Sequence, residues 1–379
     1  MGSRPSVLAE GRWLREMTGS VDFQTEDPST GINFTRDDPG LDLDTIAACL
    51  DVQYGLRVSS ATFLPLGYDL NAAVYKVITE GGTNYFLKFR FGPVKESGLL
   101  VPWALSERGI QNVLAPLKTR SGELWCTCDG GSLVLYPFIT GRNAIDAGMT
   151  DDQWREFGST LRAIHASGLV EELHGRLPAE TFALPSAALV RRILDLTETS
   201  DFENAVAARF AAFWREHAAR IHQMVARAES LGRRLQSRSF DHVLCHADIH
   251  AANILVGDDG RIHLIDWDGP LIAPRERDLH FVVGSRIARV VEPREEELFF
   301  AGYGPVDIDP DVLVYYRYER IVEDLGEIGR SVLLNPNPSD QMRAEESQLA
   351  QSFFALGRDI DHVETVSLPN RETDQYGGA

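Results

Sequence analysis

The pattern of hydrophobic positions divides the chain into a strand-rich first third and a helix-rich remainder. Gly81 and Gly82 separate two apolar stretches and predict a β-hairpin. A short helix is predicted from residue 42, capped by Asp42 or Asp44, and another helix is predicted over residues 96–108. These elements predict a small antiparallel sheet that carries one helix. The apolar stretches typical of strands are residues 58–66, 72–79, 84–90 and 132–139.

After residue 141 the apolar residues follow a helical spacing. Residues 150–168 predict a helix that begins at Thr150 or Asp151 and ends at Gly168. Residues 1–40 are polar and interrupted by Pro and Gly, so we expect an N-terminal extension, and we expect a loose tail over 366–379. Further helices are expected in residues 186–236, 275–303, 310–330 and 341–358, with a β interruption at 243–272.

Length and charge narrow the possible functions. A chain of 379 residues is long enough for two domains or for one domain of two lobes. Its 37 basic and 56 acidic residues give a net charge of −19, which disfavours binding to nucleic acid or to an anionic membrane surface. The same negative charge is compatible with binding of a cationic small molecule. No apolar run approaches the roughly 18 residues of a membrane span.

The four cysteines are too few for a disulfide scaffold at this length. Cys126 and Cys128 are one residue apart, but no second pair completes a zinc site. The N-terminus lacks the apolar segment of a secretory signal. Together these features favour a cytoplasmic protein.

The most informative stretch is residues 243–270, VLCHADIHAANILVGDDGRIHLIDWDGP. It contains His246-x-Asp248-x-x-x-x-Asn253, then two apolar strands around a GDDG turn, and then Asp266. Phosphoryl transfer needs a divalent metal across the phosphates and a carboxylate that orients the attacking hydroxyl and accepts its proton. Because Mg²⁺ prefers hard oxygen ligands, we expect Asn253 and Asp266 to bind Mg²⁺ and Asp248 to face the acceptor hydroxyl.

A different interpretation treats HADIH as half of a metal-hydrolase site, since His246, Asp248 and His250 alternate. Such a site needs further ligands, and His263 is the nearby candidate, so we favour the first interpretation. We expect His246 to hold the loop in place. His250 either lines the acceptor site or is exposed.

These residues resemble the catalytic loop of the protein-kinase-like superfamily, H-R-D-x-x-x-x-N followed by D-F-G. The sequence HADIHAANIL…LIDWD…APRERDL is more similar to the aminoglycoside phosphotransferase family, and within it to the spectinomycin phosphotransferase branch. The resemblance covers roughly residues 58–330 and implies an α+β, bilobal protein-kinase-like fold. It implies a small β-rich N-lobe over 41–138, which binds the nucleotide, and a larger helical C-lobe over 139–365, with the nucleotide between them.

The resemblance also assigns residues to the nucleotide. Lys88 occupies the position of the lysine that holds the α- and β-phosphates, with Glu96 as its expected ion-pair partner and Glu107 as the alternative. Gly67 is the one glycine where the protein-kinase loop has three, which leaves the choice between ATP and GTP open. The backbone near Tyr136 and Phe138 is expected to contact the adenine ring of the nucleotide.

For the acceptor, the resemblance suggests residues on the last helices and in the catalytic stretch. The candidates are Asp268, Glu323, Asp324 and His250. A solvated helix face is the more common explanation for charges such as those at Glu323 and Asp324. For Asp278, in APRERDL, a structural role through pairing with Arg is as plausible as a functional one.

The expected reaction is MgATP-dependent phosphorylation of a hydroxyl on a small, cationic aminocyclitol or aminoglycoside, with antibiotic resistance as a possible consequence. In protein kinases, an Arg at the position of Ala247 responds to phosphorylation of the activation loop. Because Ala247 replaces that Arg, we expect activity that does not depend on such phosphorylation. The alternatives are a metabolic kinase for a sugar, choline-like or amino-alcohol substrate, and a non-catalytic kinase-like binding protein. The oligomeric state stays open.

Overall fold

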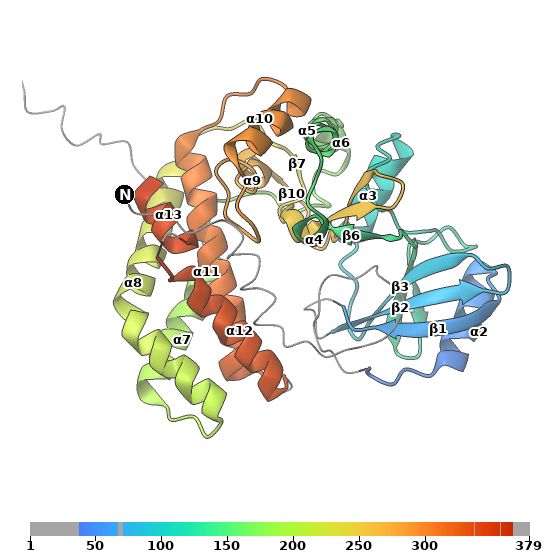
Figure 1. Cartoon of the computed structure of the whole chain (residues 1–379), viewed down its shortest axis with the longest axis horizontal. Helices are drawn as coiled ribbons and strands as arrows, with labels where there is room; N and C mark the ends of the chain where they lie inside the picture. Colours follow the sequence, from blue (N-terminus) through green and yellow to red (C-terminus); the bar gives the residue numbers. More distant parts are fainter. Residues whose placement is uncertain (1–37, 67–70, 337, 357, 367–379) are drawn as a thin grey trace, which may run out of the picture. The chain divides into compact units, whose positions relative to one another are not determined.

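The computed structural model describes residues 38–66, 71–336, 338–356 and 358–366 (Figure 1). The described residues form two compact units. The first contains residues 38–94, 115–147 and 255–260, and the second contains 95–114, 148–254 and 261–366. Most of the expected N-terminal extension and the expected tail lie outside the described residues.

The first unit is built on a five-stranded antiparallel sheet with the order β1-β2-β3-β5-β4. The four predicted strands are confirmed, with shifts of a few residues at their ends. The first unit contains α2 (Leu43–Tyr54), β1 (Val58–Leu64), β2 (Ala72–Thr79), β3 (Asn84–Arg90), β4 (Cys126–Cys128), β5 (Gly131–Pro137), β6 (Gly141–Asn143), α4 (Ala144–Ala147) and most of β8 (Ile254–Gly257).

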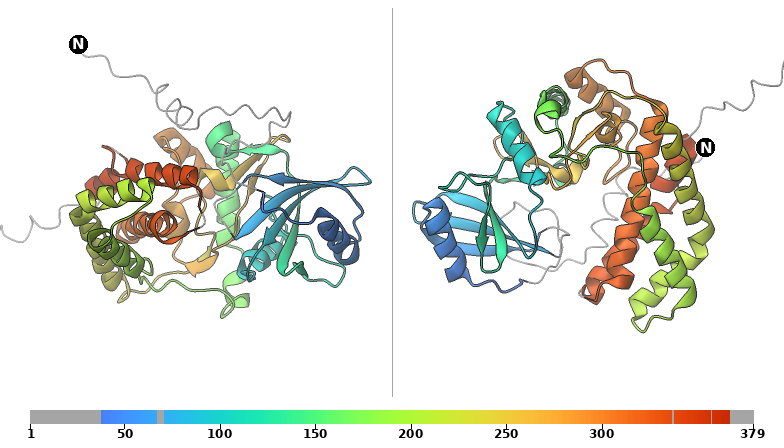
Figure 2. Two further views of the ribbon diagram at one scale, coloured as in Figure 1. Left: turned by 90° about the horizontal axis from the view of Figure 1, so that it is seen from below. Right: turned by 180° about the vertical axis from the view of Figure 1, so that it is seen from behind.

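Helix α2 begins at the predicted position because the side chain of Asp42 accepts a hydrogen bond from the Asp44 amide. Its Ile46 and Leu50 join a core with Tyr75 and Phe89 of the central strands. Figure 2 shows α2 lying along the sheet. The predicted β2–β3 hairpin is confirmed, and Gly82 adopts φ +79° in its turn, a conformation that favours glycine.

A disulfide joins Cys49 of α2 to Cys128 of β4, with 6.2 Å between the Cα atoms. The two residues are 79 positions apart in the sequence and meet because α2 packs against β4. Spacing in the sequence did not indicate this pair. Cys126 and Cys245 are free and buried.

The second unit is mainly helical. A large core cluster joins α7, α8 and α11 around Trp214, Tyr315 and Tyr316. The unit contains α3 (Ser97–Glu107), α5 (Asp151–His165), α6 (Leu169–Glu172), α7 (Ala187–Thr199), α8 (Ala205–Leu235), β7 (Val243–Cys245), the 3-10 turn η2 (Ala251–Asn253), β9 (Ile262–Leu264), β10 (Leu271–Ala273), α9 (Glu276–Leu279), α10 (Pro293–Tyr303), α11 (Pro310–Leu334), α12 (Asp340–Phe353) and α13 (Asp359–Val366).

The predicted helical stretch over 275–303 is only partly correct. The structure has α9 and α10 there, with turns and irregular chain between them. Pro293 starts α10 and Glu292 caps it, and proline cannot continue a helix that arrives from its N-terminal side. Helix α13 was not predicted.

Helices α5 and α10 approach closely, through a glycine on each. A Cβ on Gly158 would lie 2.0 Å from the Phe299 carbonyl oxygen, and one on Gly302 would lie 2.0 Å from the Arg155 carbonyl oxygen. Helix α5 begins with the predicted cap, Thr150, but it ends at His165 rather than at Gly168. The close packing fixes the end of α5, and therefore His165, in the interior of the unit.

In the part of the chain that the structure describes, no helix combines the length and the apolar character needed to cross a membrane.

Candidate active site

The loop that contains Asp248 leaves β7, which pairs with β10. His246 is buried at its start and binds backbone on both sides. Its Nδ1 accepts a hydrogen bond from the Asp248 amide at 3.3 Å, so Nε2 carries the proton and donates to the Ile265 carbonyl at 2.9 Å. The ring lies 4.4 Å from that of Trp267, centroid to centroid. His246 therefore ties the loop to the segment that carries Asp266.

Asp278, in the short helix α9, supports the same loop from beneath. Its Oδ1 accepts a hydrogen bond from the Ala247 amide at 2.7 Å, and its Oδ2 accepts from the His246 amide and from His165 Nε2, both at 3.0 Å. Ala247 has φ +74°, a region that residues with a Cβ rarely occupy. Burial alone raises the pKa of Asp278, but the His165 hydrogen bond and its neighbours hold that pKa below its usual range. Asp278 is thus structural, through His165 and backbone rather than through an arginine.

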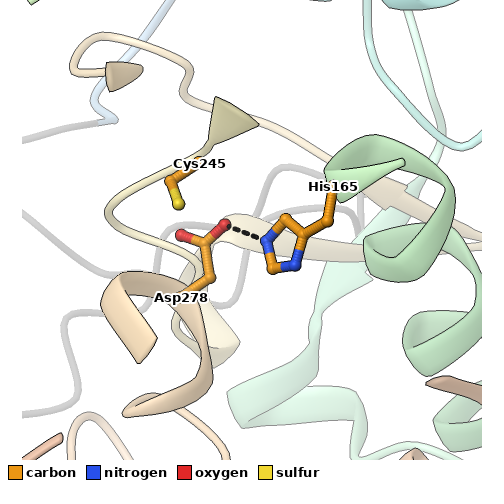
Figure 3. Close-up of side chains that lie close together, drawn as sticks. All are labelled: His165, Cys245 and Asp278. Carbon is orange, nitrogen blue, oxygen red and sulfur yellow. Dashed lines mark hydrogen bonds and ion pairs between the residues drawn. The ribbon is translucent and has the colours of Figure 1, made fainter. Parts of the chain in front are cut away.

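Within the described residues, His165, Cys245 and Asp278 are the one group of three or more His, Cys, Asp or Glu side chains close enough to hold a metal ion (Figure 3). Their hydrogen bonds argue against that use. Both nitrogens of His165 are engaged, with Asp278 and with Tyr303, and Asp278 accepts three donors. Burial raises the pKa of the Cys245 thiol well above its usual value, so the sulfur stays protonated.

Asp248 presents a half-exposed carboxylate whose two oxygens are held by different side chains. Arg320 Nη1 donates to Oδ1, and His250 Nε2 lies 3.4 Å from the same oxygen. Asn253 Nδ2 donates to Oδ2 at 3.3 Å. Burial raises the pKa of Asp248, but Arg320 and the nearby histidines outweigh it, so the pKa lies below its usual range. The group is ionised at neutral pH and is 40 % exposed, as a group that accepts a proton from a hydroxyl must be.

His250 is a support for Asp248 in this structure. Its Nδ1 accepts a hydrogen bond from the Ala252 amide at 3.2 Å, which leaves the proton on Nε2, facing Asp248. Burial, with Arg320 and His246 nearby, lowers the pKa of His250 to about 4. The ring is therefore neutral at physiological pH. The sequence left open whether this histidine lines the acceptor site or is exposed.

Asn253 and Asp266 have the chemistry expected of Mg²⁺ ligands. The Asn253 Nδ2 donates to the Asp248 carbonyl at 2.8 Å as well as to its carboxylate, so the amide oxygen is the atom left for a cation. The Asn253 carbonyl accepts the Ile265 amide at 3.0 Å, which brings Asp266 next in the chain. Asp266 is exposed and has φ +60°. One amide oxygen and one carboxylate are hard oxygen ligands that suit Mg²⁺.

Helix α11 supplies a second group of charges. Arg320 Nε donates to Asp324 Oδ2 at 2.9 Å, and Arg277 of α9 pairs with Glu319. Glu323 lies within electrostatic range of both arginines. The sequence indicated Glu323 and Asp324 as candidates for acceptor binding, which stays a prediction, and it did not indicate Arg320. The i, i+4 spacing of Arg320 and Asp324 was the available signal for their pairing, but nothing local indicated Asp248 as a partner.

Asp268 is half-buried beside the first turn of α3. There a Cβ on Gly98 would lie 3.3 Å from the Asp268 Cα and 2.7 Å from the Trp267 carbonyl oxygen. Glu96 immediately precedes α3 and Glu107 ends it, and both are exposed. The choice between them as the Lys88 partner stays a prediction, as does the substrate role of Asp268.

The residues expected at the nucleotide lie in the first unit. Lys88 is half-buried on β3, opposite Val74 of β2 and Val134 of β5. Tyr136 is near the end of β5, and Phe138 follows that strand, with the Lys76 ammonium 4.8 Å from its ring centroid. Gly67 lies outside the described residues.

The chain is similar to a known protein family and to several solved structures. The model of a phosphotransferase enzyme family (APH) matches residues 62–314. A crystal structure of spectinomycin phosphotransferase, APH(9)-Ia, in complex with ADP and spectinomycin is similar, with a TM-score of 0.77 and 32 % identity, over 85 % of this chain and 98 % of that chain. Its AMP-bound complex matches with a TM-score of 0.74 and 30 % identity, over 86 % and 99 % of the two chains.

Protein StrN of Streptomyces griseus is 26 % identical over 180 residues, which are 46 % of this chain and 55 % of that protein. The match therefore spans about half the length of this curated relative. The structural similarity confirms the predicted fold class, α+β and protein-kinase-like, with a small antiparallel sheet part and a larger helical part.

Proposed function

This chain belongs to the phosphotransferase enzyme family, and from this premise we propose that it transfers the γ-phosphoryl group of ATP to a hydroxyl of a small cationic aminocyclitol of the spectinomycin kind. The proposal rests mainly on the ionisation, exposure and hydrogen bonds of the Asp248 carboxylate. This carboxylate is ionised, partly exposed and held on both oxygens, as a group that orients a hydroxyl and accepts its proton must be.

Charge near Asp248 supports a cationic acceptor. Asp248 and four further carboxylates are grouped around two guanidinium groups, those of Arg277 and Arg320. Burial raises the pKa of Glu319 to about 7 and that of Asp324 to about 6, so the excess of negative charge is smaller than the number of carboxylates suggests. The remaining excess attracts an ammonium group and disfavours an anionic acceptor. The four further carboxylates are those of Glu180, Glu319, Glu323 and Asp324.

ATP and Mg²⁺ are the expected cofactors, in keeping with the ADP and AMP of the similar structures. Asn253 and Asp266 would hold Mg²⁺, and Lys88 would contact the phosphates. The ion would neutralise charge on the phosphates during transfer. The chain's own contribution is to orient the acceptor hydroxyl at Asp248 and to take its proton there.

Incubation with MgATP and a panel of acceptors tests the proposal. We expect spectinomycin to gain one phosphoryl group on an oxygen, detected by mass spectrometry and phosphorus NMR of the product. A kanamycin-type aminoglycoside is the second antibiotic in the panel. Turnover of choline, methylthioribose or homoserine alone would show a metabolic kinase and overturn the proposed acceptor.

Asp266→Asn tests the metal assignment. Asparagine tolerates the positive φ at this position, so the fold should be kept while the carboxylate is lost. We expect the Mg²⁺ concentration needed for half-maximal ATP binding, measured by calorimetry, to rise about tenfold or more. Asp258→Asn, an exposed aspartate in the same stretch, serves as the control. Equal Mg²⁺ dependence in the two variants would remove Asp266 from the metal site.

A further inference from the structure

The guanidinium of Arg320 lies between two carboxylates that come from different parts of the second unit. Its Nη1 donates to Asp248 Oδ1 in the catalytic loop, and its Nε donates to Asp324 Oδ2 one helical turn further along α11. The ring of Phe281 lies 5.7 Å from the guanidinium carbon. The Arg320 side chain is 20 % exposed, so this arrangement is mostly enclosed by protein.

These contacts hold both the Arg320 guanidinium and the Asp248 carboxylate in fixed directions. A guanidinium is planar and donates in set directions, so the bond to Asp324 and the Phe281 ring restrict where Nη1 can point. Nη1 in turn holds Asp248 Oδ1, while Asn253 holds Oδ2. A carboxylate with a different donor on each oxygen has little freedom to rotate about its Cβ–Cγ bond.

We propose that Arg320 is a positioning residue that sets the plane of the Asp248 carboxylate, and that Asp324 acts through Arg320 rather than by binding the substrate cation. This inference rests on the proposed function and refines it. It revises the sequence-based expectation that Asp324 contacts the acceptor, and of the two candidates on α11 it keeps Glu323.

The two roles of Asp324 predict different kinetics. If Asp324 only anchors Arg320, its loss disturbs the direction of Asp248 in the transition state, and kcat falls while the acceptor KM stays nearly constant. If Asp324 binds the acceptor ammonium, its loss weakens ground-state binding and KM rises.

The experiment compares Arg320→Met, Asp324→Asn and the double variant, using the acceptor found in the panel. We expect kcat to fall about 10- to 100-fold in Arg320→Met and less in Asp324→Asn, with the acceptor KM within about threefold of wild type. The double variant should match Arg320→Met, since residues that act through one contact are not additive. It also avoids leaving Asp324 without its counter-charge.

Arg330→Met is the matched control, because Arg330 lies on the same helix in an exposed pair with Glu327. Its kinetics should equal those of the wild type. A tenfold rise in KM for Asp324→Asn with unchanged kcat would overturn the proposal, as would additive effects in the double variant.

Crystal structures of the wild type and of the double variant give a readout that does not depend on activity. We expect the Asp248 carboxylate to rotate or to become disordered in the variant. An unchanged carboxylate plane would refute the positioning role. A wild type that phosphorylates no acceptor would refute the proposed function, and the crystal comparison would still decide the role of Arg320.

Discussion

Replacement of Asp248 by Asn is expected to lower kcat for phosphotransfer about 1,000-fold, within the range that general base catalysis contributes. The amide has nearly the shape of the carboxylate but cannot take the proton of the acceptor hydroxyl. It also removes the charge that pairs with Arg320. ATP affinity should change little, because Asp248 is not among the residues proposed to hold the nucleotide.

The measurement combines ADP release in the presence of acceptor with ATP binding by calorimetry. Asp258→Asn is again the control, an exposed aspartate whose loss should leave both quantities at wild-type values. Transfer by Asp248→Asn at a rate within threefold of wild type would disprove the proposed mechanism. Loss of ATP binding together with transfer would place Asp248 in the nucleotide site instead.

Replacement of Asp278 by Asn is expected to have the largest effect on stability, a loss of about 3 kcal/mol in the free energy of unfolding. Both oxygens of Asp278 face donors only: the amides of His246 and Ala247 and the Nε2 of His165. An asparagine side chain must turn its NH₂ group toward one of these donors. The strained backbone of Ala247 then loses a contact that holds it in place.

Urea unfolding followed by tryptophan fluorescence measures this loss. Asp152→Asn is the control, since its side chain is 96 % exposed and pairs only locally with Arg155, and it should change stability by less than about 0.5 kcal/mol. An Asp278→Asn variant as stable as that control would show that the hydrogen bonds of Asp278, of which Figure 3 shows the one to His165, contribute little to stability.

The pH dependence of unfolding adds a second test of Asp278. Its pKa in the folded state lies below the usual value, so its contribution to stability is present above the unfolded-state pKa and is lost as pH falls through the folded-state pKa. The wild type should therefore lose more stability than Asp278→Asn on acidification below about pH 4. Parallel curves for the two proteins would argue against a depressed pKa.

The sequence by itself predicted most elements that have a strong local signal. The hairpin at Gly81–Gly82, the cap at Asp42 and the cap at Thr150 depend on residues within a few positions of each other, and the structure has each of them. The middle of 275–303 was misassigned because its apolar residues allow a helix, whereas Pro293 and its cap begin a new one.

The candidate chemistry was also visible in the sequence, because Asp248, Asn253 and Asp266 lie in one short stretch of loops and strands. A mechanism that needs a carboxylate and two metal ligands at fixed spacing can be recognised from a short sequence motif. The sequence could not show that Arg320 holds Asp248 or that Asp278 holds its loop, since both residues come from elsewhere in the chain.

Only the tertiary structure decided those supporting contacts. Arg320 is 72 residues from Asp248, His165 is 113 residues from Asp278, and Cys49 is 79 residues from Cys128. Each pair meets because helices or strands pack against each other, and the packing is decided by whole apolar faces rather than by the residues that then come into contact. The sequence therefore determined which groups can react, and the packing of the helical unit determined how Asp248 is oriented.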